Sequence, residues 1–267
     1  MASMSPSIEP KDLLARLDRI GAALRDSGHA MALLALGSVG LDSERLDRYS
    51  DLDFFVVVES GHKARYIENL DWLAVAHPLA WHFRNTVDGH KALMTDGIFC
   101  EFAVFELQEL DGIPFAPGRI VWRRADVDES IAIPRRPMPD TQLPDEAWIV
   151  GEALSCLFVG LQRWHRGERL SAGRMVQGHA VDRLIELDAL RGGFDGPRPT
   201  ADPFGRERRL EQRQPGLVAD LPAVMPGYSR TPEAALAILE ALQRRAAVLD
   251  PSITARIREL AGRLEQD

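Results

Sequence analysis

Cysteine is scarce in this sequence, and the two cysteines present form no motif. Cys100 falls in an apolar, strand-like run and Cys156 in a helical run of the 267 residues. A disulfide framework or a cysteine-based metal site needs more thiols at closer spacing. We therefore predict that both side chains pack in the interior and carry no chemistry.

The sequence also lacks a long apolar run and a basic balance of charge. No stretch approaches the length of a membrane span, and the first residues lack the basic-then-apolar layout of a secretory signal. The 32 Lys and Arg face 40 Asp and Glu, and the net charge of −8 argues against affinity for a nucleic-acid backbone. We expect a cytoplasmic protein with neither a membrane nor a nucleic-acid partner.

The composition is ordinary for a globular protein, with 45% hydrophobic and 27% charged residues, and the length suits one large domain or two modest ones. A change of composition marks the boundary between two. Prolines gather where apolar runs are few, at positions Pro134, Pro137, Pro139 and Pro144. We predict a first domain over residues 1–130, a Pro-rich linker over 131–144, and a second domain over 145–267.

The first domain reads as a mixture of helices and strands. Apolar residues three and four apart predict amphipathic helices over residues 10–27 and 63–76. Short apolar runs predict strands over residues 31–36, 53–58, 79–83 and 119–124. Two more strands, 91–95 and 98–107, flank the dipeptide Asp96-Gly97, which suits the tight turn of a hairpin.

The second domain reads as helical. The helices expected there cover residues 146–164, 172–190, 232–249 and 252–264. Between them lies a loop-rich segment, 192–229, with a basic run at Arg206, Arg208, Arg209 and Arg213. This run is either a solvated face paired with Glu207 and Glu211 or a source of arginines for an anionic substrate. The fold class expected for the whole chain is α+β.

Two aspartates stand at the start of the second apolar strand. The sequence from Ser50 to Val58 reads Ser-Asp-Leu-Asp-Phe-Phe-Val-Val-Val. Residues two apart on a strand point to the same side, so Asp51 and Asp53 share one face, opposite Leu52. Like charges on one face repel unless a positive group lies between them. The pair is either a turn residue followed by a strand residue, or two ligands of one cation.

A turn that could bind an anion precedes this pair. Gly37 and Ser38 follow a short apolar strand, and the turn from Gly37 to Gly40 would expose backbone N–H groups. The connector that follows contains Arg45 and Arg48, which either reach phosphates or keep the connector solvated.

A third acid, Glu101, lies in the middle of an otherwise apolar strand. It shares a face with Phe99, Ala103 and Phe105. A carboxylate on a half-buried strand needs a partner, which can be a neighbouring Lys or Arg, a proton or a metal ion. Glu106 lies on the opposite face and is the weaker candidate.

Gly37-Ser38, the connector and Ser-Asp-Leu-Asp entering a strand resemble the signature of the polymerase-beta-like nucleotidyltransferase superfamily. The resemblance implies a mixed sheet with flanking helices, followed here by a helical domain. It implies that Gly37, Ser38 and the nearby Arg48 bind the nucleotide, and that Asp51 and Asp53 bind one or two Mg²⁺ ions. It favours Glu101 as the third metal-binding carboxylate, with a role as catalytic base in some relatives.

The helical second half and the stretch Tyr49 to Phe54 resemble the antibiotic nucleotidyltransferases, most of all the lincosamide type. The activity this implies is adenylylation: AMP passes from ATP to a hydroxyl of a small lincosamide- or aminoglycoside-like acceptor, and pyrophosphate leaves. Two alternatives remain. The acceptor could be a partner protein, as in nucleotidyltransferase antitoxins, or the chain could bind nucleotide without turnover. A homodimer is compatible with the apolar helical half.

Overall fold

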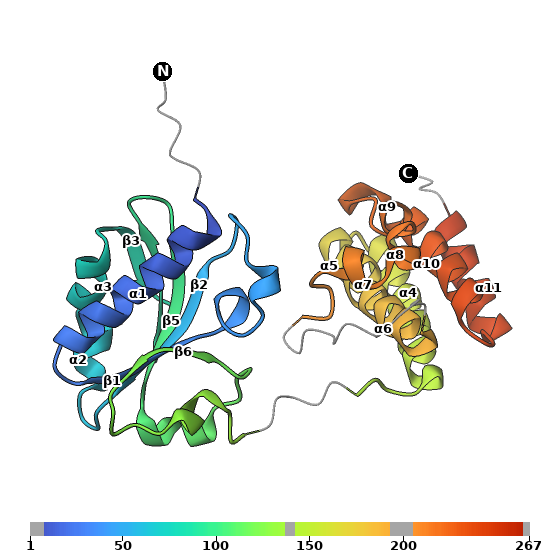
Figure 1. The fold of residues 1–267 in the computed structure, drawn as a ribbon. Helices are drawn as coiled ribbons and strands as arrows, with labels where there is room; N and C mark the ends of the chain where they lie inside the picture. The colour runs from blue at the N-terminus through green and yellow to red at the C-terminus, as the bar shows by residue number, and fades with distance from the viewer. Residues whose placement is uncertain (1–7, 137–141, 193–204, 264–267) are drawn as a thin grey trace. The chain divides into compact units, whose positions relative to one another are not determined.

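The computed structural model describes residues 8–136, 142–192 and 205–263. The chain divides into two compact units, Met1–Pro139 and Asp140–Asp267. The first contains a sheet with helices and the second is helical (Figure 1), so the α+β class is confirmed. Residues 137–141 of the expected linker lie outside the described residues.

The first unit is built on a six-stranded mixed sheet with the order β3-β4-β5-β2-β1-β6. The strands are β1 (Ala30–Ala35), β2 (Leu52–Val58), β3 (Leu79–Arg84), β4 (Gly89–Met94), β5 (Phe99–Glu106) and β6 (Arg119–Arg123). Strands β2 and β5 pair in parallel, and the other neighbours pair antiparallel. The parallel pair at the centre places residues of the two strands side by side in register.

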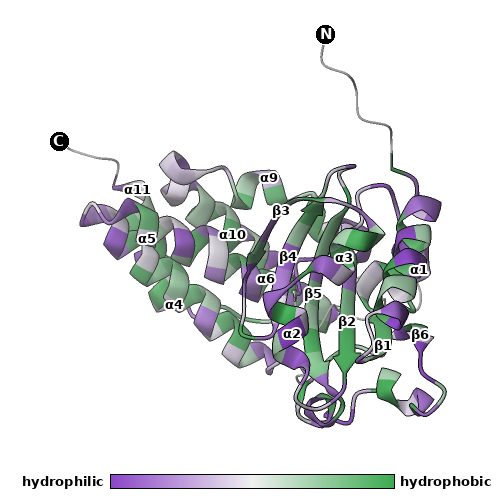
Figure 2. Ribbon diagram, turned by 90° about the vertical axis from the view of Figure 1, so that its left-hand side faces the viewer, coloured by the Kyte–Doolittle hydropathy of each residue, from purple (hydrophilic) through white to green (hydrophobic). Residues whose placement is uncertain are grey.

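One face of this sheet is covered by three helices, α1 (Pro10–Asp26), α2 (Lys63–Glu68) and α3 (Asp71–Ala76). Figure 1 shows α1 lying across the sheet, and Figure 2 shows β2 in the hydrophobic colour along most of its length. The core here is formed by fully buried side chains from α1 and the central strands, among them Leu13, Leu17, Ile20, Leu33, Phe54, Val56 and Val104. The helical spacing of α1 and the alternation of β2 thus converge on one core, as expected.

The single helix expected over residues 63–76 is wrong, because the chain breaks at Asn69. This residue is extended, with φ −130° and ψ 115°, and its side-chain oxygen accepts a hydrogen bond of 3.0 Å from the Asp71 N–H. Asx side chains compete for backbone N–H groups in this way and so favour turns. The break also turns Val75 out to solvent, where it is 78% exposed, although its spacing placed it on the apolar side.

The opposite face of the sheet is covered only in part within the described residues. A smaller cluster there joins the sheet to the 3-10 helices η3 (Leu107–Gly112) and η4 (Glu129–Ala132). Its buried members are Ala32, Leu34, Val57, Phe105, Leu110 and Ala132, with Phe55 and Ala103 packed against them. The cluster lies toward the carboxyl ends of β2 and β5. The amino ends of these strands, with Asp53 and Glu101, carry half-buried polar side chains on that face.

The β4–β5 hairpin forms at the expected dipeptide. Gly97 has φ +97°, the left-handed conformation that glycine adopts without strain, and the Ile98 N–H donates to Asp96 Oδ1 at 3.3 Å. The buried Arg16 of α1 reaches this turn, with its Nη2 atom 2.6 Å from Asp96 Oδ2. The turn therefore also fixes the first helix on the sheet.

The second unit packs its helices around α4 (Glu146–His165), whose residues Ile149, Ala153, Leu157 and Leu161 are buried in one core. The remaining helices are α5 (Arg169–Arg174), the π-helix η5 (Met175–Ala180), α6 (Val181–Arg191), α7 (Leu210–Arg213), α8 (Pro215–Val218), α9 (Leu221–Val224), α10 (Thr231–Arg245) and α11 (Pro251–Gly262). The helix expected over 172–190 thus contains a π-helical segment. None of the helices in the described residues combines the length and the apolar character that a membrane span needs.

Two minor expectations concern side chains outside the site. Cys100 and Cys156 are both free and buried, as predicted. In the basic segment, Arg206 Nε lies 3.6 Å from an oxygen of the buried Glu186, and the buried Arg213 donates to the backbone carbonyl oxygens of Arg206 and Arg208. At least these two arginines thus help to hold their own loop in place.

Candidate active site

The two aspartates lie on the partly open face of the sheet, as their spacing predicts. Leu52 and Phe54 are buried against the helices, while Asp51 and Asp53 are half-buried on the other side. The turn before them is held by Asp47, whose carboxylate accepts a hydrogen bond of 2.8 Å from the Tyr49 N–H. A compact turn therefore delivers Asp51 to the amino end of β2.

Glu101 lies beside Asp53. The two residues are register partners on the parallel strands β2 and β5, and partners in a parallel pair project from the same face. Neighbouring strands are about 4.8 Å apart, so two carboxylates meet at this point. The predicted placement of Glu101, on a neighbouring strand with its side chain on the face of the aspartates, is confirmed.

Glu101 has a basic partner from the next strand. Lys91 on β4 is its register partner, with Nζ 2.9 Å from Glu101 Oε2, and Asn85 Nδ2 lies 3.5 Å from Oε1. This is the lysine pairing that the sequence left open as an alternative to a metal ion. The two side chains are 34% and 42% exposed, and exposed pairs of this kind contribute less than about 1 kcal/mol. A divalent cation can therefore compete with Lys91 for the carboxylate.

The Asp51 side chain has a different environment. Within the described residues its carboxylate takes part in no hydrogen bond or ion pair, although the residue is half-buried. A half-buried carboxylate without a partner favours binding of a cation. Asp51, Asp53 and Glu101 together offer oxygen ligands of the type that Mg²⁺ prefers.

The Gly37–Ser38 turn lies directly on Asp53. Gly37 begins a 3-10 helix, η1 (Gly37–Val39), with φ +55°, and a Cβ atom added there would lie 2.8 Å from Asp53 Oδ2. Glycine is required on both grounds, the left-handed backbone and the close approach. The Leu36 N–H donates to the Asp53 carbonyl oxygen at 2.8 Å, which holds the turn beside the acidic pair.

A further basic residue, Arg119 on β6, binds this turn. Its Nε and Nη2 atoms donate to the Val39 carbonyl oxygen at 3.2 Å and 3.1 Å. Sequence reasoning missed Arg119, because it lies eighty positions after Val39 and no local spacing links the two. The signal was its position at the start of the edge strand expected over residues 119–124.

Arg48 lies on the exposed connector, where its guanidinium stacks over the Tyr49 ring at 4.9 Å. Tyr49 itself is 80% exposed. The structure thus gives Arg48 an aromatic neighbour on the surface, and its role in nucleotide binding stays a prediction.

Two other candidates have structural explanations. Glu106 accepts hydrogen bonds from the Gly61 N–H and the Ser60 hydroxyl, which lower the pKa of its carboxyl group, so this acid holds a loop. Burial raises the pKa of the Cys100 thiol to about 12, so this thiol has no thiolate chemistry at neutral pH. A cavity of about 350 Å³ lies elsewhere, beside Lys63 and Arg84, and none of the three candidate acids lines it.

No protein-family model matches the chain, and no curated protein sequence matches it. Three solved structures have a similar arrangement. They are an aminoglycoside 6-adenyltransferase from Bacillus subtilis (11% identity, 92% of this chain and 90% of that chain, TM-score 0.34), a nucleotidyltransferase-like protein from Exiguobacterium sibiricum (13%, 86% and 75%, 0.29) and a STING-associated CdnE c-di-GMP synthase from Capnocytophaga granulosa (9%, 96% and 80%, 0.29). At these identities and TM-scores the likeness is weak, and the functional proposal rests on the chain's own residues.

Proposed function

We propose that the chain is a magnesium-dependent nucleotidyltransferase that moves AMP from ATP to a hydroxyl group of a small acceptor. The observation that carries this proposal is the meeting of Asp53 with Glu101 on one side and with Gly37 on the other. Carboxylates suit a divalent cation, and a glycine turn with exposed N–H groups suits phosphate oxygens. Their contact fits a metal–triphosphate complex.

The acids fit the metal that this reaction requires. Asp51 and Asp53 would hold one or two Mg²⁺ ions, and Glu101 would complete the site after exchange of its lysine partner. When bound, Mg²⁺ neutralises charge on the triphosphate and stabilises the leaving pyrophosphate. The half-buried Asp51 and the space above Asp53 that glycine keeps free both support this assignment.

The chain's own groups supply the remaining parts of the reaction. The backbone N–H groups around Gly37 and Ser38 bind phosphate oxygens, with Arg119 fixing the turn and Arg48 as a further contact. The acceptor oxygen attacks the α-phosphorus, and the bond from that phosphorus to the pyrophosphate oxygen breaks in line. Glu101 takes the proton of the acceptor hydroxyl, which requires its carboxylate to be free of Lys91 at that moment.

For the acceptor we propose a lincosamide or aminoglycoside. The support is the sequence from Tyr49 to Phe54, which resembles the lincosamide enzymes, and the helical unit that follows the sheet. We propose a cytoplasmic location, ATP as the nucleotide and a small molecule, not a nucleic acid, as the acceptor, in keeping with the net charge of −8.

The experiment is incubation of the full chain with ATP, Mg²⁺ and a panel of lincosamides and aminoglycosides, followed by mass spectrometry of each acceptor. A gain of one nucleoside monophosphate on a panel member is expected, with loss of the product in Asp53→Asn. Asp18→Asn is the matched control, because Asp18 is exposed on α1 and the chemical change is the same. Product formation by Asp53→Asn at the wild-type rate would contradict the assignment.

A second candidate is magnesium-dependent nucleotide binding without transfer. The Lys91–Glu101 pair favours it, since a permanent lysine partner would keep Glu101 from acting as ligand or base. Calorimetric binding of ATP with Mg²⁺ but no modified acceptor and no pyrophosphate would support this candidate. A mass gain on a partner protein in a cell extract, in place of the small molecules, would instead identify a protein acceptor.

A further inference from the structure

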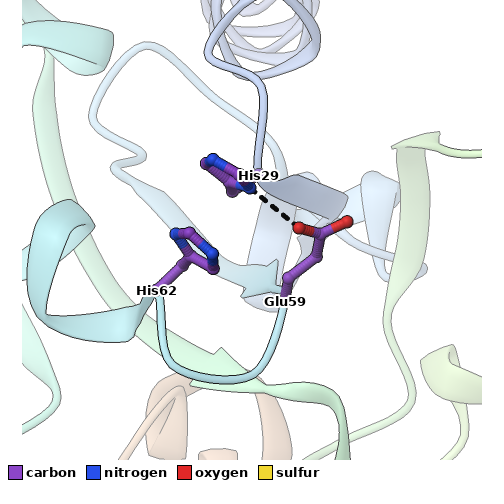
Figure 3. A group of neighbouring side chains, drawn as sticks. All are labelled: His29, Glu59 and His62. Atoms are coloured by element: carbon purple, nitrogen blue, oxygen red, sulfur yellow. Dashed lines mark hydrogen bonds and ion pairs between the residues drawn. The ribbon is translucent and has the colours of Figure 1, made fainter.

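Two histidines and a glutamate meet at the far end of β2, away from the candidate active site. Figure 3 shows the rings of His29 and His62 next to the carboxylate of Glu59. His29 Nδ1 lies 2.8 Å from Glu59 Oε2, and the two imidazole rings stack with centroids 3.6 Å apart. One ligand atom from each of the three residues lies within 4.8 Å of the others.

Three separate elements contribute these side chains. His29 lies in the turn between α1 and β1, Glu59 follows β2, and His62 is the residue before α2. The backbone fixes their spacing, because the Glu59 N–H donates to the His29 carbonyl oxygen at 3.0 Å and the His62 N–H donates to the Glu59 carbonyl oxygen at 3.1 Å. Asp53 and Glu59 are six residues apart along a strand, or about 20 Å, so this cluster is separate from the acidic site.

We propose that His29, Glu59 and His62 bind a divalent transition-metal ion of the Zn²⁺ class. Two imidazoles and one carboxylate are a ligand set for Zn²⁺, and a water molecule would fill the fourth position. Mg²⁺ is a poor occupant, because it selects oxygen ligands. The proposal does not depend on the function proposed for Asp51, Asp53 and Glu101.

The distances are close to those that the ion requires. With ligand bonds of about 2.1 Å, tetrahedral coordination separates ligand atoms by about 3.4 Å. The His29–Glu59 separation of 2.8 Å must therefore open slightly as the metal replaces the shared proton, and no separation exceeds 4.8 Å. His29 is exposed and the other two are half-buried, so the imidazoles can rotate to turn their lone pairs toward one point.

The charges around the cluster leave one carboxylate oxygen available. Arg124 Nη1 pairs with Glu59 Oε1, so Oε2 is the oxygen directed at His29. Asp126 pairs with the same guanidinium at 2.8 Å and offsets its charge. Arg124 thus orients Glu59 as a hydrogen-bond donor behind a metal ligand does.

The simplest competing explanation is an ordinary His29–Glu59 ion pair with His62 packed on it. The two explanations differ in what His62 does. The His62 side chain makes no capping hydrogen bond to α2, so its replacement by Ala removes a ligand without a structural contact other than ring stacking. His62→Ala is therefore the decisive variant, and circular dichroism on heating confirms that it folds.

The test is titration of the chelator-treated full chain with Zn²⁺ by calorimetry, with excess Mg²⁺ to occupy the acidic site, and a parallel titration with Co²⁺ followed by visible absorption. Wild type is expected to bind Zn²⁺ and to give the d–d bands of a low-coordinate Co²⁺ site. His62→Ala should bind at least tenfold more weakly and lose the bands, while His179→Ala, an exposed histidine of the second unit, should match wild type. Asp53→Asn should also retain the site.

No Zn²⁺ uptake by wild type, or equal uptake and equal spectra in His62→Ala, would overturn the proposal. Loss of binding in Asp53→Asn with retention in His62→Ala would do so as well, since the ion would then occupy the acidic site. Loss of nucleotidyl transfer with retention of the Zn²⁺ site would separate a failure of the proposed function from a failure of this inference.

Discussion

Asp53 and Glu101 are register partners on two parallel strands and project their carboxylates from the same face of the sheet. Two carboxylates so close repel each other unless a positive group lies nearby. Lys91 supplies that charge from the third strand in the row. The account therefore turns on an exchange in which a divalent cation takes the place of a lysine.

Replacement of Lys91 by Met removes the competing ammonium group. An exposed ion pair contributes less than about 1 kcal/mol, so we expect Mn²⁺ to bind about two- to fivefold more tightly to Lys91→Met in the presence of a non-hydrolysable ATP analogue. Mn²⁺ binding followed by electron paramagnetic resonance measures this. Lys11→Met on the exposed side of α1 is the control, and weaker Mn²⁺ binding by Lys91→Met would show that the lysine orients Glu101 instead.

Replacement of Gly37 by Ala should damage the site and the fold together. The left-handed backbone costs about 1–2 kcal/mol for a residue with a Cβ atom, and the new methyl group would push the Asp53 carboxylate aside. We expect a loss of that size in the free energy of unfolding, measured with urea, and weaker Mn²⁺ binding.

Gly167 offers the control for this change. It has φ +81° and no atom within 4 Å of an added Cβ, so Gly167→Ala carries backbone strain without a clash. Its stability should fall by a similar amount while Mn²⁺ binding stays at the wild-type level. Equal Mn²⁺ binding in both variants would disconnect the turn from the acids.

Replacement of Arg119 by Met removes both hydrogen bonds to the Val39 carbonyl oxygen. An acceptor left without its donors costs about 1–3 kcal/mol, and the turn should lose its fixed shape. We expect reduced stability and an ATP affinity lowered severalfold, measured by equilibrium dialysis. Arg123→Met, which removes a similar bond to the Val127 carbonyl oxygen on the same strand, should lower stability without changing ATP binding.

Replacement of Asp96 by Asn breaks the ion pair with the buried Arg16 but keeps a dipeptide suited to the hairpin turn. Leaving a buried guanidinium without its carboxylate should lower the free energy of unfolding at neutral pH by about 3 kcal/mol. Arg16→Met with Asp96→Asn should restore part of this loss, because the double variant buries no unpaired charge. Urea unfolding of the three variants measures the difference.

The same pair gives a prediction for acid pH. Burial raises the pKa of Asp96, but the hydrogen bonds from Arg16 and the Ile98 N–H outweigh it, and the pKa lies below the ordinary value of 3.8. The resulting stability is therefore present above pH 3.8 and is lost as the pH falls below it. Asp96→Asn should show a shallower decline of stability in that acid range; an identical decline would remove Asp96 as a contributor.

Local patterns in the sequence predicted the acidic face well. The alternation of a strand places Asp51 and Asp53 opposite Leu52, and it places Glu101 opposite Cys100, whatever the rest of the chain does. The Asp96-Gly97 turn was equally readable, since it depends on a glycine in a left-handed conformation. These features arise from residues within a few positions of one another.

The features that could not be predicted depend on residues far apart or on competition between weak preferences. Lys91 and Arg119 find their partners through strand order, which no spacing in the sequence encodes. The break at Asn69 results from one side-chain hydrogen bond that competes with a continuous helix. The cluster of His29, Glu59 and His62 is assembled from three loops and follows no local period.

The central claim is nucleotidyl transfer at Asp51, Asp53 and Glu101, and the most direct test is the fate of two labels in ATP. In reactions with the acceptor panel and Mg²⁺, label on the α-phosphate should move to an acceptor while label on the γ-phosphate leaves as pyrophosphate, and Asp53→Asn should show neither. Transfer of the γ-label to an acceptor, or α-label transfer that survives Asp53→Asn unchanged, would contradict the account.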